Sequence, residues 1–161
     1  MAIPVPAESI PHEALSRLTV THRYDAPCER VFDAFLDVAV AQRFLFATAK
    51  GEMITAEIDP RVGGQFTFTE RRPDMGDVRH VGEYREIARP HRLAFTFGVP
   101  QFDPRQTDVT IGIDADGTGC RLTLIQDGVA PAYAEQSREG WSRILAGVLP
   151  AWHGVQAAGW L

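Results

Sequence analysis

Hydrophobic and polar residues alternate with a period of two along most of the chain, which is typical of β-strands that bury one face. The pattern begins at residues 18–24, where Leu18, Val20 and Tyr24 share one face. Six further segments carry the same period or a strand-like composition between turn residues: 53–58, 65–71, 78–87, 93–97, 109–113 and 120–126. The short links between these segments predict an antiparallel meander.

Helical spacing replaces this alternation in two parts of the chain. After Pro27, apolar residues that include Val31 and Phe35 predict a short helix, and a second short helix is expected at about 38–46. Near the end, a stripe at i, i+4 and i+7 predicts one long amphipathic helix over about 132–149, formed by Trp141, Leu145 and Val148. Pro150 is expected to end or kink this helix.

Together these elements predict an α+β fold in which a seven-stranded, curved antiparallel sheet wraps around the long C-terminal helix, with two short helices after the first strand. We expect a single domain at residues 16–153, a flexible N-terminal arm at 1–15 and a C-terminal tail at 154–161. Apolar residues of the arm and the tail offer a contact for a homodimer: Ile3, Val5, Ile10, Trp160 and Leu161.

Composition argues against several classes of function. The 161 residues carry a formal net charge of -5, and Lys50 is the only lysine, which disfavours a nucleic-acid partner. No apolar run approaches the ~18 residues that span a bilayer, and the first residues lack the pattern of a signal peptide, so we expect a cytoplasmic protein. Two cysteines, and five histidines without metal-ligand spacing, predict no disulfide scaffold, no metal site and no cofactor.

Motifs of covalent and phosphate chemistry are also missing from the sequence. Cys28 lies in the first turn of a predicted helix, but no histidine follows at a revealing spacing. Ser137 and Ser142 lie outside any G-x-S-x-G motif, and Gly63-Gly64 lacks the lysine and hydroxyl residue of a phosphate-binding loop. The sequence therefore assigns no catalytic residue.

The inward strand faces and the apolar stripe of the long helix enclose the predicted interior, where we expect a cavity. Polar residues on these faces either orient a ligand or lie hydrated at strand ends; they are His22, Glu70, His80, Tyr84 and Gln126. We expect polar contacts to a ligand from His80, Tyr84 and Gln126. The predicted apolar lining is Phe66, Phe68, Phe95, Ile111, Leu122, Leu124, Trp141, Leu145 and Val148.

Two glycines beside the helical stripe bear on whether this interior is open. Gly140 and Gly147 each cost roughly 0.5–1 kcal/mol relative to alanine in a helix, so close backbone approach or spare room is the expected compensation. The alternative to an open cavity is that side chains fill the space, as in any small core.

Several segments resemble the SRPBCC or START-like superfamily, whose helix-grip fold is shared with the major birch-pollen allergen. The segments are YDAP at 24–27, VFDAF at 31–35, DPRVGG at 59–64 with Phe66 and Phe68, GEYREI at 82–87, PHRLAF at 90–95, GCRLTL at 119–124 and GW at 140–141. Within the superfamily the chain looks most like the branch named after the activator of the heat-shock-protein ATPase. The resemblance covers about residues 16–150.

This resemblance implies a fold but leaves the function open, because the superfamily includes hydrophobic-ligand carriers, aromatase/cyclase enzymes and a co-chaperone domain, with no shared catalytic motif. We expect binding of a small hydrophobic or amphipathic molecule rather than catalysis. One alternative is a cyclase- or aromatase-like enzyme that uses Tyr84, His80 or Glu70 as acid or base. The other is a chaperone-associated interaction module.

Overall fold

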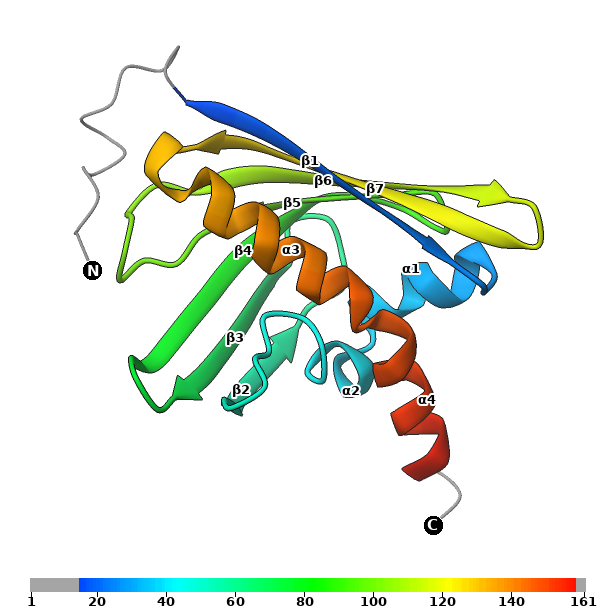
Figure 1. Cartoon of the computed structure of the whole chain (residues 1–161), viewed down its shortest axis with the longest axis horizontal. Helices are drawn as coiled ribbons and strands as arrows, with labels where there is room; N and C mark the ends of the chain where they lie inside the picture. The colour runs from blue at the N-terminus through cyan, green and yellow to red at the C-terminus, as the bar shows by residue number, and fades with distance from the viewer. Residues whose placement is uncertain (1–14, 159–161) are drawn as a thin grey trace.

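Seven antiparallel strands form one curved sheet in the computed structural model, which describes residues 15–158 (Figure 1). The strands are β1 (Ser16–Tyr24), β2 (Glu52–Ile58), β3 (Gln65–Arg72), β4 (Gly76–Ala88), β5 (Arg92–Phe97), β6 (Thr107–Asp116) and β7 (Gly119–Val129). Their order across the sheet is β1-β7-β6-β5-β4-β3-β2, so β2 to β7 form a meander and β1 pairs with β7. The predicted seven-stranded antiparallel sheet is confirmed.

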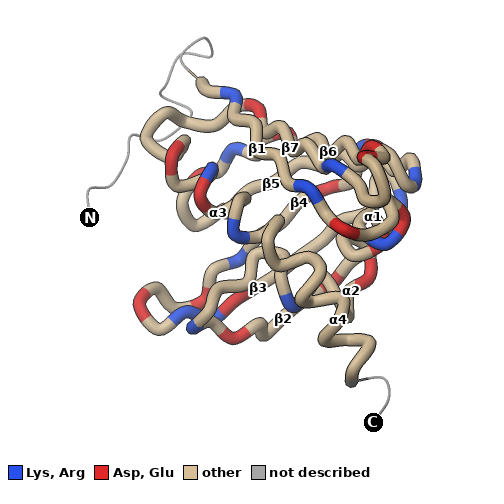
Figure 2. Tube along the Cα trace, turned by 45° about the vertical axis from the view of Figure 1, so that its right-hand side comes forward, with Lys and Arg blue, Asp and Glu red and all other residues tan. Residues whose placement is uncertain are grey.

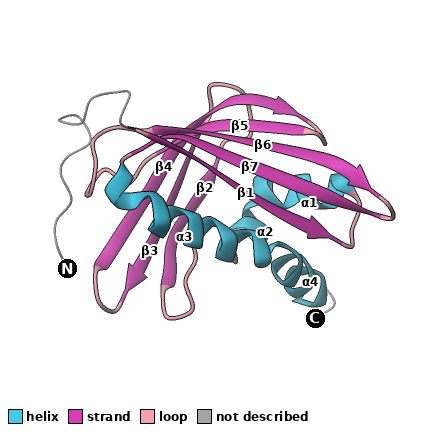
Figure 3. Ribbon diagram, turned by 45° about the horizontal axis from the view of Figure 1, so that its top comes forward, coloured by secondary structure: helices cyan, strands magenta, loops and turns pink. Residues whose placement is uncertain are grey.

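The helices gather on the concave side of this sheet. The helical elements are α1 (Cys28–Leu36), α2 (Val38–Ala41), the 3₁₀ helix η3 (Pro131–Tyr133), α3 (Ala134–Ala146) and α4 (Val148–Ala158). Figures 1 and 3 show α3 crossing the strands on that side, with α1 and α2 near its C-terminal end. This is the helix-grip arrangement that the sequence predicts.

Strand β4 joins two parts of the sheet, and a glycine lies where they meet. The first half of β4 pairs with β3, whereas the second half pairs with β5 from Tyr84 onward. A Cβ atom added to Gly82 would lie 1.9 Å from the carbonyl oxygen of Thr96 and 2.4 Å from the ring of Phe66. Only glycine therefore permits this close approach of β4 to β5 and to the Phe66 ring.

The edge strand β2 departs from strict alternation. A bulge between Met53 and Thr55 leaves Ile54 outside the register with β3. As a result Ile54 is 39% exposed, while Met53 packs against the core. The alternating pattern of the sequence predicts that Ile54 shares one strand face with Ala56 and Ile58. The extra residue of the bulge makes that prediction wrong for Ile54.

The predicted long C-terminal helix is confirmed, and it is kinked just before Pro150 as expected: α3 ends at Ala146 and α4 begins at Val148, after Gly147. Pro150 has no N–H to donate to the carbonyl of Ala146, and its ring would clash with that carbonyl in a continuous helix. The kink therefore precedes Pro150, which lies in the first turn of α4, where an N–H is not needed. Helix α4 then continues to Ala158, beyond residue 153, where the sequence analysis ended the domain.

A buried tyrosine compensates for this break. The hydroxyl of Tyr24 in β1 donates a 2.7 Å hydrogen bond to the carbonyl of Leu145, in the last turn of α3. Helix C-termini leave carbonyl groups without helical partners, and here a side chain of the sheet supplies one. On the other side of the break, the guanidinium of Arg30 in α1 lies 4.2 Å from the ring centre of Trp152 in α4.

Charged residues of both signs are interspersed over the strands and over α1 and α3, whereas α4 contains no Lys, Arg, Asp or Glu (Figure 2). In the described part of the chain, no helix is long and apolar enough to cross a membrane. The apolar residues suggested for a homodimer contact belong to the terminal segments 1–14 and 159–161, which lie outside the described residues.

Candidate functional site

A pocket of about 250 Å³ lies between helix α3 and the strand ends that face its N-terminal half. Five parts of the chain line it: residues 46–48, the β3–β4 hairpin at Arg72, Val78 and His80, parts of residues 97–107, residues 126–130 without Asp127, and one face of residues 133–144. The two ends of this lining are far apart in sequence, and the curvature of the sheet brings them together.

Phe46 forms the inner wall of the pocket and stacks on two other lining residues. Its ring is nearly parallel to those of His80 and Phe97, at centroid distances of 4.7 and 4.9 Å. The ring of Trp141 meets Phe46 edge-on at 5.8 Å. The backbone of Phe46 has φ 61°, in the left-handed region that a bulky residue rarely adopts. Such strain is typical of residues that tertiary packing holds in place.

A chain of hydrogen bonds crosses the pocket wall from the helix to the sheet. The indole nitrogen of Trp141 donates to Gln126 Oε1 at 2.8 Å, and Gln126 Nε2 donates to Thr107 Oγ1 at 2.9 Å. Thr107 in turn donates to the carbonyl of Phe97 at 3.0 Å. Because both ends of the Gln126 amide have protein partners, Gln126 positions Trp141.

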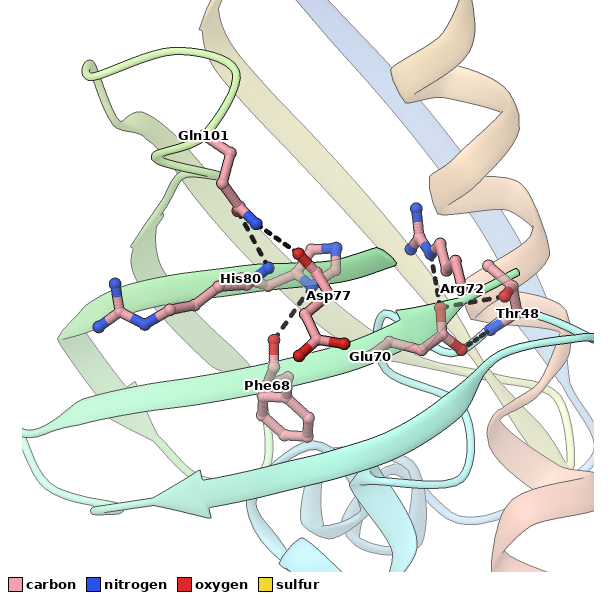
Figure 4. Close-up of polar contacts among 8 residues, drawn as sticks. Thr48, Phe68, Glu70, Arg72, Asp77, His80 and Gln101 are labelled. Carbon is pink, nitrogen blue, oxygen red and sulfur yellow. Dashed lines mark hydrogen bonds and ion pairs between the residues drawn. The ribbon is translucent and has the colours of Figure 1, made fainter. Parts of the chain in front are cut away.

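His80 is buried in the pocket wall and held in one tautomer (Figure 4). Its Nδ1 lies 3.1 Å from the carbonyl oxygen of Phe68, which can only accept, so Nδ1 carries the proton and Nε2 does not. Burial lowers the pKa of His80 to about 4, and the nearby Arg72 charge also lowers it. The imidazole is therefore neutral at pH 7.

A buried carboxylate fixes the loop that carries Phe46 (Figure 4). Glu70 is 1% exposed and accepts from Arg72 Nε at 2.6 Å, from the Thr48 backbone N–H at 2.6 Å and from Thr48 Oγ1 at 3.0 Å. A Cβ atom on Gly51 would lie 2.2 Å from this carboxylate, so the loop passes close over it. Glu70 therefore acts on the pocket by positioning residues 46–48.

The part of the lining at residues 97–107 is fastened to β4 by the side chain of Gln101 (Figure 4) and by a backbone bridge between Gly98 and Val81. Gln101 Nε2 donates to the carbonyl of Asp77 at 2.5 Å, and Gln101 Oε1 accepts from the backbone N–H of Arg79 at 3.1 Å. The amide thus occupies the edge of β4 where β5 does not reach. Phe102 in the same segment is 48% exposed and lines the pocket.

The structure brings three of the twelve predicted site residues to this pocket: His80, Gln126 and Trp141. The other nine are buried in the packed core and do not line it: Phe66, Phe68, Tyr84, Phe95, Ile111, Leu122, Leu124, Leu145 and Val148. Packing explains the difference, since the Phe66 ring meets those of Tyr84 and Phe95 at 5.6 and 5.4 Å. Burial also raises the pKa of Tyr84, whose phenol stays protonated.

The two helix glycines have different surroundings. A Cβ atom on Gly140 would meet nothing within 4 Å, and Gly140 lines the pocket. A Cβ atom on Gly147 would lie 3.0 Å from Cβ of Phe44. Gly140 therefore adjoins open space, which is the spare room expected for one of these glycines. Gly147 instead permits close packing against the segment after α2.

Sequence reasoning missed most of the lining, and the reason is its location. Phe46, Arg72 and Arg105 lie in loops or at strand ends, where neither period applies. Phe97 was within reach, because it follows Phe95 at the spacing of two that marks one strand face. His22 shares the inward face of β1, but its ring centre lies 4.5 Å from that of Tyr24, with the two rings tilted, and it does not line the pocket.

Nucleophile and metal chemistry receive little support from the described residues. Cys28 and Cys120 are both buried and unpaired, and burial raises the pKa of Cys120 to about 11, which disfavours its thiolate. Within residues 15–158, no group of three or more His, Cys, Asp or Glu side chains is arranged to hold a metal ion.

Comparison with known proteins connects this fold to one family. Residues 25–151 match the family described as activator of Hsp90 ATPase homolog 1-like protein. The chain is similar to a solved protein from Rhodobacter sphaeroides, with 21% identity and a TM-score of 0.72 over 92% of this chain and 96% of that one. It is also similar to an AHSA1-like protein from Aeromonas hydrophila, with 20% identity and a TM-score of 0.70 over 89% and 94%.

A third similar structure is an HSP90 activator from Plasmodium falciparum, with 22% identity and a TM-score of 0.62 over 82% of this chain and 92% of that one. At these identities the likeness concerns the fold. Among curated proteins, none matches this chain.

Proposed function

The chain belongs to the activator of Hsp90 ATPase homolog 1-like family, and we propose that it binds a small amphipathic molecule in the pocket between α3 and the sheet. The observation that carries this proposal is Gly140, which adjoins open space on the pocket side of α3. A glycine that lowers helix stability and fills no packing requirement is explained if the space beside it is used.

The lining supports an amphipathic rather than a purely polar ligand. The aromatic side chains of Phe46, Phe97 and Trp141 line the pocket, and Ile144 adds an aliphatic side chain. A volume of about 250 Å³ lies just below the range for drug-sized ligands, so a one- or two-ring molecule or a medium-length chain fits it best.

A thermal-shift and calorimetric screen tests the proposal. The probes are indole, 2-naphthoate, 2-naphthylmethanol, octanoate and 1-octanol. Gly140→Leu places a side chain in the open space and is expected to abolish binding. Ser142→Leu adds a leucine to an exposed position of the same helix and is expected to bind as the wild type does. The proposal fails if no probe binds, or if the Gly140→Leu protein binds as well as the wild type.

The geometry of the pocket supports an acid–base enzyme less well than it supports a ligand-binding protein. Of the three groups considered as acid or base, His80 alone lines the pocket. Glu70 is engaged by Thr48 and Arg72, and Tyr84 is buried among aromatic rings. Among the described residues, the imidazole of His80 hydrogen-bonds to the carbonyl of Phe68 and to no titratable side chain, so no acid–base pair includes it.

A second candidate function is a contact with an Hsp90-type chaperone. The family description and the likeness to the Plasmodium protein favour it, and the open edge of the sheet offers a surface. Ile54, Val62 and Met75 are exposed in or near the β2–β3 hairpin, at 39%, 60% and 41%. If this candidate is correct, the chain changes the ATPase rate of an Hsp90, and Ile54→Glu reduces the effect.

A further inference from the structure

We infer that the ligand of this pocket is a monoanionic carboxylic acid whose carboxylate is bound by Arg105 and Arg143; this inference rests on the proposed function. Both side chains line the pocket, one from the segment between β5 and β6 and the other from α3.

The arrangement of ion pairs distinguishes these two arginines from most others in the chain. Ten of the fifteen arginines pair with an aspartate or glutamate. Arg72 is one of them, since Glu70 neutralises it. Within residues 15–158, neither Arg105 nor Arg143 has a carboxylate within 4.0 Å, although both line the pocket. Arg105 is half-buried and Arg143 is exposed, so both guanidinium groups are accessible to a partner that enters the pocket.

Unused hydrogen-bond donors make these arginines suitable for an anion. The Arg105 guanidinium has one protein contact, from Nη2 to the carbonyl of Gly128 at 3.4 Å. Arg143 makes no hydrogen bond to the described residues and follows Gly140 by three positions, on the same face of α3. A guanidinium offers five N–H donors in a planar fork that matches a carboxylate.

The remaining polar groups of the pocket indicate how much negative charge a ligand should carry. Asp103 is the only acidic residue of the lining, and its carboxylate accepts from the Arg105 backbone N–H at 2.9 Å. His80 is neutral at pH 7 and adds no positive charge. The lining is therefore modestly positive in a chain of net charge -5, which suits one negative charge better than a phosphate ester carrying two.

Titration calorimetry with 2-naphthoate and 2-naphthylmethanol tests this inference, because the two probes share a ring system and differ in charge. We expect 2-naphthoate to bind at least tenfold more tightly than the alcohol. Arg105→Gln and Arg143→Gln should each weaken 2-naphthoate about tenfold and leave the alcohol unchanged, as expected for loss of a charged hydrogen-bond donor. Arg138→Gln, on the exposed side of α3 and paired with Glu135, is the matched control and should change neither.

Thermal unfolding and circular dichroism of each variant verify that it is folded. Equal binding of both probes, with no effect of Arg105→Gln or Arg143→Gln, overturns the carboxylate inference and leaves the proposed ligand function standing. Absence of binding by both probes overturns the proposed function and the inference with it. Weaker naphthoate binding in 0.5 M NaCl than in 0.05 M NaCl, with unchanged alcohol binding, is the further result expected.

Discussion

The indole nitrogen of Trp141 donates a 2.8 Å hydrogen bond to the side-chain oxygen of Gln126, which ties α3 to β7 beside the pocket. Both residues are nearly fully buried, at 3% and 2% exposure. The bond fixes the rotation of the indole, which lines the pocket.

Gln126→Leu should lower the free energy of unfolding by about 1–3 kcal/mol, because it leaves the buried N–H of Trp141 without an acceptor. Urea titration followed by circular dichroism measures the change. Gln65→Leu, at an exposed position of β3, should stay within about 0.5 kcal/mol of the wild type. Equal stability of the two variants would show that the Trp141–Gln126 bond contributes nothing.

The two glycines of the C-terminal helices should respond oppositely to alanine. Gly140→Ala should raise the free energy of unfolding by about 0.5–1 kcal/mol, since its methyl group enters open space and alanine favours the helix. Gly147→Ala should lower it by about 1 kcal/mol or more, because the methyl group presses on Phe44. Urea titration of both proteins checks the signs, and a gain in both would contradict the close packing at Gly147.

His80 should make stability fall as the pH drops from about 6.5 to about 4. Its pKa is about 4 in the folded state and about 6.5 in the unfolded chain, so only the unfolded state binds the proton between these values. The resulting loss of unfolding free energy is absent above about pH 6.5, amounts to about 3 kcal/mol in total and stops growing below about pH 4. Urea titrations at pH 7.0, 5.5 and 4.5 measure the free energy of unfolding of the wild type and of His80→Gln. This free energy should fall more steeply with decreasing pH in the wild type; parallel pH dependences would refute the assignment.

Glu70→Gln should cost about 1–3 kcal/mol of unfolding free energy, since Arg72 loses its buried counter-ion and Thr48 its charged acceptor. The backbone amide of Thr48 should exchange its hydrogen faster, and by a larger factor than the loss of global stability explains, because the loop before β2 opens locally. Glu83→Gln removes an exposed partner of Arg85 and serves as the control, with an expected change below about 0.5 kcal/mol.

Periodicity was sufficient to predict the fold because the buried faces are regular. Trp141 and Leu145 were placed on one helical stripe by their spacing, and the structure buries both almost completely. The spacing of two likewise placed Leu122 and Leu124 on the inward face of β7, and neither is exposed. Where one face is buried and the other solvated, the hydrophobic pattern determines the register.

The same reasoning failed where geometry depends on single residues. The bulge at Ile54 shifts the chain locally, and no period marks it. The open part of the interior is determined by which rings happen to fill the rest, and Phe46 reaches it from a segment outside the regular elements. An inward strand face therefore predicts burial, but it does not predict a pocket.

The left-handed backbone of Phe46 means that this residue can be replaced by a smaller one at a lower cost in stability than an ordinary core phenylalanine. An ordinary core phenylalanine cannot be removed without losing about 3–5 kcal/mol, whereas glycine at this position also relieves a backbone penalty of about 1–2 kcal/mol. Phe46→Gly and Phe46→Ala leave similar cavities, yet the glycine protein should be the more stable of the two by about 1 kcal/mol in urea titration. One substitution at a strained site would thus enlarge the pocket at a reduced cost in stability, which makes residue 46 the natural place to begin changing the volume of the pocket.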